Sequence, residues 1–127
     1  MACRITELVV DSRDPRALAQ WWAEVLGYVV LGEDEDDGAV EIGLPGQEAY
    51  GPQPTLVFAP VARPTPGKLG WHVDVNATDR DQAAELARLL ALGATPTDVG
   101  QGNVGWHVLA DPEGNVFCLL GRQVDRL

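Results

Sequence analysis

The chain has 127 residues, the length of one ordinary domain, and 46% of them are hydrophobic, so a folded globular protein is expected. Nine basic residues stand against nineteen acidic ones, and the sequence pI is about 4.4. Such an acidic chain repels phosphate backbones and anionic lipid surfaces, which excludes nucleic acid and membranes as expected partners.

The first half predicts a strand, a helix and three further strands. The stretch "TELVVDSRD" ends in Asp14, a typical N-cap, and Pro15 follows at the first helical position. Gly27 can end the helix in a left-handed conformation. Helical periodicity predicts the apolar stripe of this helix as Leu18, Trp22, Val25 and Leu26. After the helix, alternation predicts strands near residues 28–31, 39–44 and 55–59.

The second half predicts the same order of elements. The strand in "WHVDVNATD" runs into Asp79, which we expect to cap a helix that Gly93 ends. The apolar stripe of this helix is expected to be Leu86, Leu89 and Leu90. The later strands are expected near residues 95–99, 105–110 and 116–120. A strand-helix-three-strand module is therefore repeated, and the Pro-rich "VARPTPGK" joins the copies.

These boundaries predict a single domain over residues 1–127. Module one covers about 4–61, the connector about 62–68 and module two about 69–122. Either module alone could bury little apolar surface, so the two are expected to share a core.

Strand alternation predicts which side chains face away from the helices. In the leading strands, Glu7 matches His72, and Asp74 lies on the same face as His72. Setting "LVFAP" on "NVFCL" matches Ala59 with Cys118 in the closing strands.

The paired modules, the "D…WW…LGY" helix, the "HVDV" strand and the closing "DPEGNVFCLL" resemble the glyoxalase, bleomycin-resistance and extradiol-dioxygenase superfamily, also called vicinal oxygen chelate. The similarity is greatest to its small bacterial glyoxalase-like domain proteins. It implies an α+β fold in which two βαβββ modules form a cup of curved sheets. The floor of this cup carries four positions, one from each leading and each closing strand, which hold a divalent ion in metal-dependent members.

The resemblance places Glu7, Ala59, His72 and Cys118 at those four positions. Ala59 has no donor atom and Cys118 must ionise to bind a metal, so no metal cofactor is favoured. A zinc site of Glu7, His72 and Cys118 with one open position is the alternative. A buried apolar role is favoured for Cys118 over that of a ligand. Glu7 is then either solvated or accepts a hydrogen bond from His72.

The motif GWHV occurs twice and contains both histidines. His107 has no symmetry relation to His72, so we expect it to be a poor metal ligand that faces solvent or the upper cavity wall. Trp71 and Trp106 are each next to a histidine, and both an aromatic wall for a flat ligand and plain core filling are open to them.

Three functions are compatible with these residues. The favoured one is a metal-free binding protein that sequesters a small organic molecule, for example an antibiotic or other natural product. Its ligand-binding residues are expected to be Glu7, His72, Asp74, Trp71, Trp106, Ala59 and Cys118. The alternative is a lyase, isomerase or dioxygenase that is metal-dependent or uses His72 and Glu7 for acid-base catalysis. The third is an accessory module whose cup is filled by its own side chains.

The sequence also predicts the cellular location and the oligomeric state. The start of the chain lacks signal-peptide regions, and no apolar run reaches the about 18 residues of a membrane span, so a cytoplasmic location is expected. Cys3 and Cys118 should then remain thiols. The family resemblance implies a homodimer.

Overall fold

A computed structural model describes residues 2, 4–47, 51–65 and 69–127 of the chain. The chain divides into two compact units, Met1–Pro64 and Thr65–Leu127, and their boundary falls inside the predicted connector. Within the described ranges, neither helix has the length and apolar character to cross a membrane.

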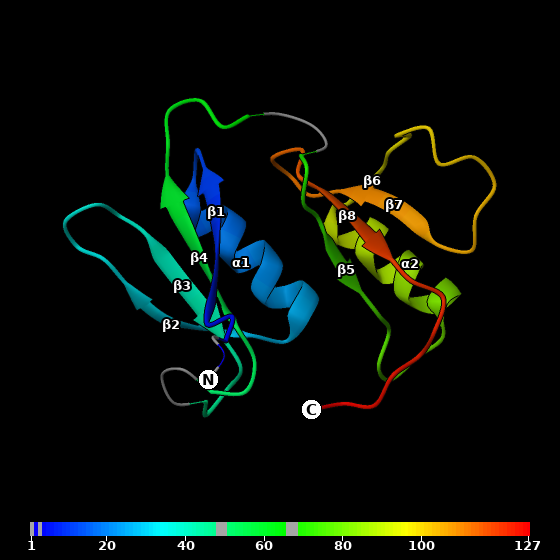
Figure 1. Cartoon of the computed structure of the whole chain (residues 1–127), viewed down its shortest axis with the longest axis horizontal. Coiled ribbons are helices and arrows are strands. Elements are labelled where there is room, and N and C mark those ends of the chain that lie inside the picture. The colour runs from blue at the N-terminus through cyan, green and yellow to red at the C-terminus, as the bar shows by residue number, and fades with distance from the viewer. Residues whose placement is uncertain (1, 3, 48–50, 66–68) are drawn as a thin grey trace. The chain divides into compact units, whose positions relative to one another are not determined.

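The first unit is one mixed sheet with one helix. Its elements are β1 (Glu7–Ser12), α1 (Pro15–Leu26), β2 (Val29–Glu33), β3 (Val40–Gly43) and β4 (Thr55–Pro60). The strand order is β1-β4-β3-β2, with β1 parallel to β4 and the other pairs antiparallel. Figure 1 shows α1 lying across one face of this sheet.

The second unit repeats this plan. Its elements are β5 (Val73–Val75), α2 (Gln82–Leu92), β6 (Thr95–Pro96), β7 (His107–Ala110) and β8 (Val116–Leu119). The strand order β5-β8-β7-β6 again has a parallel leading pair, and α2 lies across one face of the sheet (Figure 1). The prediction of an α+β chain made of two βαβββ modules is confirmed.

Helix α1 begins and ends where the sequence predicts. The Asp14 carboxylate accepts a hydrogen bond from the Ala17 N–H at 3.2 Å, and Gly27 closes the helix with φ of 68°. Leu18 and Trp22 are buried, as expected of the apolar stripe. The rings of Trp21 and Trp22 pack in a T-shaped arrangement, with their centroids 5.1 Å apart.

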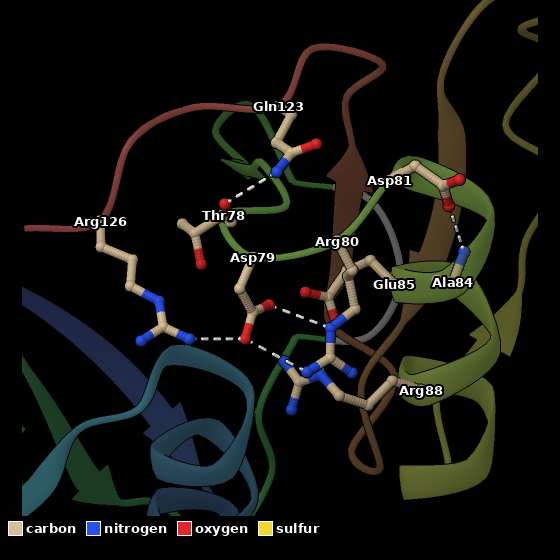
Figure 2. Close-up of polar contacts among 9 residues, drawn as sticks. All are labelled: Thr78, Asp79, Arg80, Asp81, Ala84, Glu85, Arg88, Gln123 and Arg126. Carbon is tan, nitrogen blue, oxygen red and sulfur yellow. Dashed lines mark hydrogen bonds and ion pairs between the residues drawn. The ribbon is translucent and has the colours of Figure 1, made fainter.

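Helix α2 begins later than predicted, because Asp81 and not Asp79 is its N-cap. The Asp81 carboxylate accepts from the Ala84 N–H at 2.8 Å. Asp79 instead pairs with two guanidinium groups, at 3.0 Å to Arg80 and 2.8 Å to Arg126 (Figure 2). The ion pairs use the carboxylate that the sequence pattern assigns to the cap.

The Asp79 ion pairs help to fasten the C-terminal segment to the second unit. The hydrogen bonds from Arg80 and Arg126 hold the pKa of the Asp79 carboxyl far below its ordinary value. Next to them, Gln123 donates to the carbonyl of Thr78 at 3.0 Å (Figure 2). The segment after β8 is therefore tied to the loop that leads into α2.

Each unit has its own apolar core between helix and sheet. In the first unit Phe58, Ile42 and Leu18 are almost completely buried. The corresponding side chains of the second unit are Leu89, Leu109, Phe117 and Leu119. The burial of Phe117 and Leu119, with Cys118 between them, fixes which face of β8 points away from the core.

The first predicted strand after helix α2 is shorter than expected. Strand β6 has only Thr95 and Pro96, whereas the sequence predicts a strand over residues 95–99. After Pro96 the chain bonds to its own side chains: the N–H groups of Val99 and Gly100 donate to Gln101 and Asp98. Such local bonds compete with a strand ladder and turn the chain.

Candidate functional site: a cavity in the second unit

The second unit contains a cavity of about 350 Å³. Residues from β5, β7, β8 and the loop after β6, together with their flanking positions, line it. They are His72, Asp74, Val99, Gln101, Trp106, Val108, Val116, Cys118 and Leu120. The wall is mainly apolar, with a small polar group of side chains.

Strand alternation in β8 provides one wall of the cavity. Val116, Cys118 and Leu120 line the cavity, whereas Phe117 and Leu119 point to the core with at most 1% exposure. The thiol of Cys118 is therefore at the cavity surface of a rigid strand, although the residue is only 7% exposed.

The polar side chains come from β5 and the residue before it. His72 Nε2 lies 3.2 Å from Asp74 Oδ1, so the imidazole and the carboxylate are within hydrogen-bond distance. Both belong to the same strand face, because they are two residues apart. Asp74 is also the register partner of Cys118 in the parallel β5–β8 pair. Neighbouring backbones thus hold the carboxylate and thiol side by side.

The loop after β6 contributes Val99 and Gln101 to the lining of the cavity. The Gln101 amide is used within the loop: its oxygen accepts from the Val99 N–H at 2.9 Å, and its nitrogen donates to the Thr97 carbonyl at 3.3 Å. The Thr97 N–H donates to the Val108 carbonyl of β7. These bonds fix the loop against the sheet.

The two GWHV copies have different environments. Trp106 lines the cavity and is 42% exposed, whereas Trp71 is 87% exposed and is not among the lining residues. His72 lines the cavity, but His107 lies exposed at the start of β7 outside its lining. The two histidines therefore lie in different environments.

The predicted site residues of the first unit lie on β1 and β4. Glu7 is exposed at the start of β1 and lies opposite Thr55. Ala59 is half-buried near the end of β4, opposite Asp11. Their membership of a ligand site stays a prediction, because the cavity described above is built by the second unit.

The registers show whether the predicted matches of the leading and the closing strands agree with each other. In the second sheet Asp74 lies opposite Cys118. In the first sheet Val9 lies opposite Val57, and Asp11 lies opposite Ala59. The match of Glu7 with His72 sets Val9 on Asp74, whereas the match of Ala59 with Cys118 sets Asp11 on Asp74. The two predicted matches therefore differ from each other by two residues.

His72, Asp74 and Cys118 together form a group of metal donors. One imidazole nitrogen, one carboxylate oxygen and the thiol sulfur all lie within 4.8 Å of one another. The family resemblance implies His72 and Cys118, with Glu7 as the acid, for the alternative in which a metal is bound, and the structure brings Asp74 to the imidazole and the thiol. A nitrogen, an oxygen and a sulfur donor fit a zinc ion with three protein ligands.

Several lining residues were not predicted from the sequence. Val116 and Leu120 could have been found from Cys118, because positions two apart in a strand share a face. Val99 and Gln101 carry no comparable signal, since the loop after β6 brings them to the cavity.

Comparison with protein families identifies the family of this chain. The profile of the glyoxalase-like domain matches residues 7–120. The chain belongs to the glyoxalase-like domain family. A comparison with curated protein sequences found no match.

Solved structures of this fold have varied activities. The antibiotic-binding protein TnmS3 from Streptomyces sp. CB03234 is 18% identical, with a TM-score of 0.58 over 94% of this chain and 95% of that one. A mutant of the fosfomycin resistance protein FosX from Listeria monocytogenes, complexed with Mn(II) and 1S,2S-dihydroxypropylphosphonic acid, is 11% identical, with a TM-score of 0.70 over 98% and 96%. The oxidase ChaP-H2 is 18% identical, with a TM-score of 0.66 over 96% and 95%. At these identities the likeness shows the fold.

Proposed function

We propose that this glyoxalase-like protein binds a small organic molecule in the cavity of its second unit and sequesters it. The ligand class that we expect is an antibiotic or another natural product. The observation that carries this proposal is an aliphatic and aromatic cavity with its polar groups gathered around His72, Asp74 and Cys118.

The size and walls of the cavity suit such a ligand. Pockets for small molecules usually measure about 300–1,000 Å³ and combine apolar walls with a few polar groups. The cavity of about 350 Å³ has four aliphatic side chains and the indole of Trp106 in its lining. A flat ring can stack on this indole, and binding through these walls requires no metal.

The charge of the lining favours an uncharged or cationic ligand. Asp74 is acidic, and none of the described residues that line the cavity is Lys or Arg. An anionic ligand would meet a like charge, with no Lys or Arg among the described lining residues to pair with it. FosX, by contrast, is solved with a phosphonic acid and Mn(II). We therefore favour the sequestering role for which TnmS3, an antibiotic-binding protein, offers a precedent in this fold.

A pair of planar probes tests the proposal. Aminoacridine, a cation, and anthracene carboxylate, an anion, have similar ring area and opposite charge. Each is titrated into chelator-treated full-length protein by calorimetry and tryptophan quenching. We expect aminoacridine to bind more tightly than anthracene carboxylate, since Asp74 lies in the lining.

The two GWHV copies supply matched controls for this titration. Trp106→Phe should weaken aminoacridine binding and remove most of the quenching, because Trp106 lines the cavity. Trp71→Phe should leave affinity unchanged, because Trp71 is 87% exposed. The assignment to this cavity would be overturned if neither probe bound. It would also be overturned if only Trp71→Phe lost affinity.

A lyase, isomerase or dioxygenase activity is the second candidate. The donor cluster of His72, Asp74 and Cys118 favours it, since a metal held there would act as a Lewis acid towards a substrate oxygen. Without a metal, His72 could move protons while Asp74 holds its imidazole, and a contribution from Glu7 remains a prediction. Turnover that needs an added metal and is lost in His72→Ala would support the enzyme over the sequestering protein.

The state of assembly is also a proposal. We expect a homodimer in solution, and sedimentation velocity of the full chain distinguishes it from a monomer. The third alternative, a module filled by its own side chains, is disfavoured by the open cavity of the second unit.

A further inference from the structure

We propose that Gln82, the first residue of α2, is a positioning residue that holds the Trp106 wall of the cavity in place. Gln82 is not among the residues that line the cavity, so it acts through Trp106. Its effect on ligand affinity rests on the proposed function, whereas its effect on the placement of Trp106 can be measured without a ligand.

Trp106 lies just beyond the end of a strand pair. The last register pair of the antiparallel β7–β8 ladder at this end is His107 with Leu119, so the backbone at Trp106 is outside the ladder. Trp106 nevertheless forms part of the cavity lining. Contacts other than the ladder must therefore fix the position of this indole.

The side chain of Gln82 provides such contacts from the helix. Its Nε2 donates to the carbonyl of Gly105 at 3.1 Å and to the carbonyl of Leu119 at 3.3 Å. Gly105 directly precedes Trp106, and Leu119 is the last residue of β8. One amide group thus uses both of its hydrogens to join the segment before β7 to the end of β8, at the place where the ladder stops.

Close packing at Gly121 limits where the same carbonyl can lie. A Cβ atom at Gly121 would be 3.2 Å from the Gly105 oxygen and 3.8 Å from the Gln82 Nε2. The first distance is shorter than an ordinary van der Waals contact, so a side chain at Gly121 would push the carbonyl away. The hydrogen bond from Gln82 and the missing side chain at Gly121 therefore place Gly105 together, and with it Trp106.

The position of Gly105 matters for binding because the indole follows it directly in the chain. Trp106 is partly exposed, which leaves its ring open to a ligand. Stacking between flat rings depends on their separation and offset, and dispersion contacts weaken when a gap opens between the surfaces. Gln82 should therefore affect the affinity of the cavity for planar ligands.

Fluorine NMR of the full chain labelled with fluorotryptophan tests the placement of Trp106. Each tryptophan gives its own signal, and Trp106→Phe identifies the one from Trp106. Gln82→Glu keeps the length of the side chain but removes its N–H groups, and a carboxylate in the first turn is favourable to the helix dipole. We expect Gln82→Glu to shift the Trp106 signal and to leave those of Trp21 and Trp22 in place.

Gln123→Glu is the matched control for this substitution. Gln123 also donates its side-chain amide to a backbone carbonyl, that of Thr78, but it lies outside the cavity lining (Figure 2). Its replacement adds the same charge and should leave the Trp106 signal in place.

Gly121→Ala tests the same placement without adding a charge. The variant keeps the Gln82 amide but crowds the Gly105 carbonyl, so it should also shift the Trp106 signal. Circular dichroism confirms that each variant is folded, and the two variants disturb Gly105 by different means.

Calorimetric titration with aminoacridine then measures the effect on affinity. The negative charge of Gln82→Glu would by itself attract this cation. We nevertheless expect binding to weaken by about two- to tenfold, the effect of one neutral hydrogen bond. Gln123→Glu should not weaken binding.

Three results would overturn the proposal. The first is an unchanged Trp106 signal in folded Gln82→Glu and Gly121→Ala. The second is a shift of that signal in Gln123→Glu as large as in Gln82→Glu. The third is an unchanged affinity of Gln82→Glu when the wild type binds aminoacridine. If the wild type binds neither planar probe, the sequestering function fails, but the fluorine signals still decide the role of Gln82, so the two failures are distinguishable.

Discussion

Asp74 and Cys118 lie directly opposite each other on the neighbouring parallel strands β5 and β8. This register places the carboxylate and the thiol on the cavity face of the second sheet, and His72 joins them because it shares the face with Asp74. The adjacent residues of β8 point the other way into the core. One strand thus serves the site and the stability of the unit with alternate side chains.

Substitutions at neighbouring positions of β8 should therefore have unequal effects on stability. Phe117→Ala removes a ring that is 1% exposed and should lower the free energy of unfolding by about 3–5 kcal/mol. Cys118→Ala removes one atom beside a cavity and should cost about 1 kcal/mol. Urea denaturation of the variants measures both. Equal losses would contradict the assignment of faces.

Gly27 should be required for its backbone conformation and not for space. It has φ of 68°, and a Cβ atom there would meet no atom within 4 Å. Gly27→Ala should destabilise the protein by about 1–2 kcal/mol, the cost of a left-handed residue with a side chain. Gly32→Ala is the control, since Gly32 also has open space around it but is not in that conformation. Thermal unfolding compares them, and a similar decrease in both variants would count against the conformational explanation.

Because Asp81 is the N-cap of α2, its substitution should lower the stability of the protein. Asp81→Ala removes the acceptor for the Ala84 N–H and should cost about 0.5–2 kcal/mol. Asp81→Asn retains a capping oxygen and should remain close to the wild type. Chemical denaturation with helix content followed by circular dichroism checks this pair. The interpretation is wrong if alanine and asparagine behave alike.

Asp79 should stabilise the protein in a pH-dependent way. Its pKa is lowered in the folded state by Arg80 and Arg126, so its contribution is present above the unfolded-state pKa of about 4. It is lost as the pH falls from there towards the lowered folded-state pKa. Asp79→Asn should thus lower the unfolding midpoint at neutral pH and do so less in acid, while added salt reduces the difference. A difference that is independent of pH would exclude this ion-pair role.

Much of the fold could be predicted because it depends on local patterns. The repeat of strand, helix and three strands follows from periodicity that each segment carries by itself. Asp14 and Gly27 could be assigned as the ends of α1 because caps are chosen within one turn of the chain. The exposed position of His107 and the cavity position of Trp106 were among the alternatives, but the sequence could not decide between them.

The sequence by itself determined the two-module α+β fold, the family, and the presence of His72, Asp74 and Cys118 as chemically capable residues. Only the tertiary structure decided which acid accompanies the imidazole and the thiol. The strand register made Asp74 the neighbour of Cys118, and it showed that the local alignments of Glu7 with His72 and of Ala59 with Cys118 differ by two residues. Likewise, Asp79 pairs with Arg126, which is 47 residues away in the sequence, and Asp81 is the N-cap of α2. Register and ion pairs join distant segments, so no local pattern encodes them.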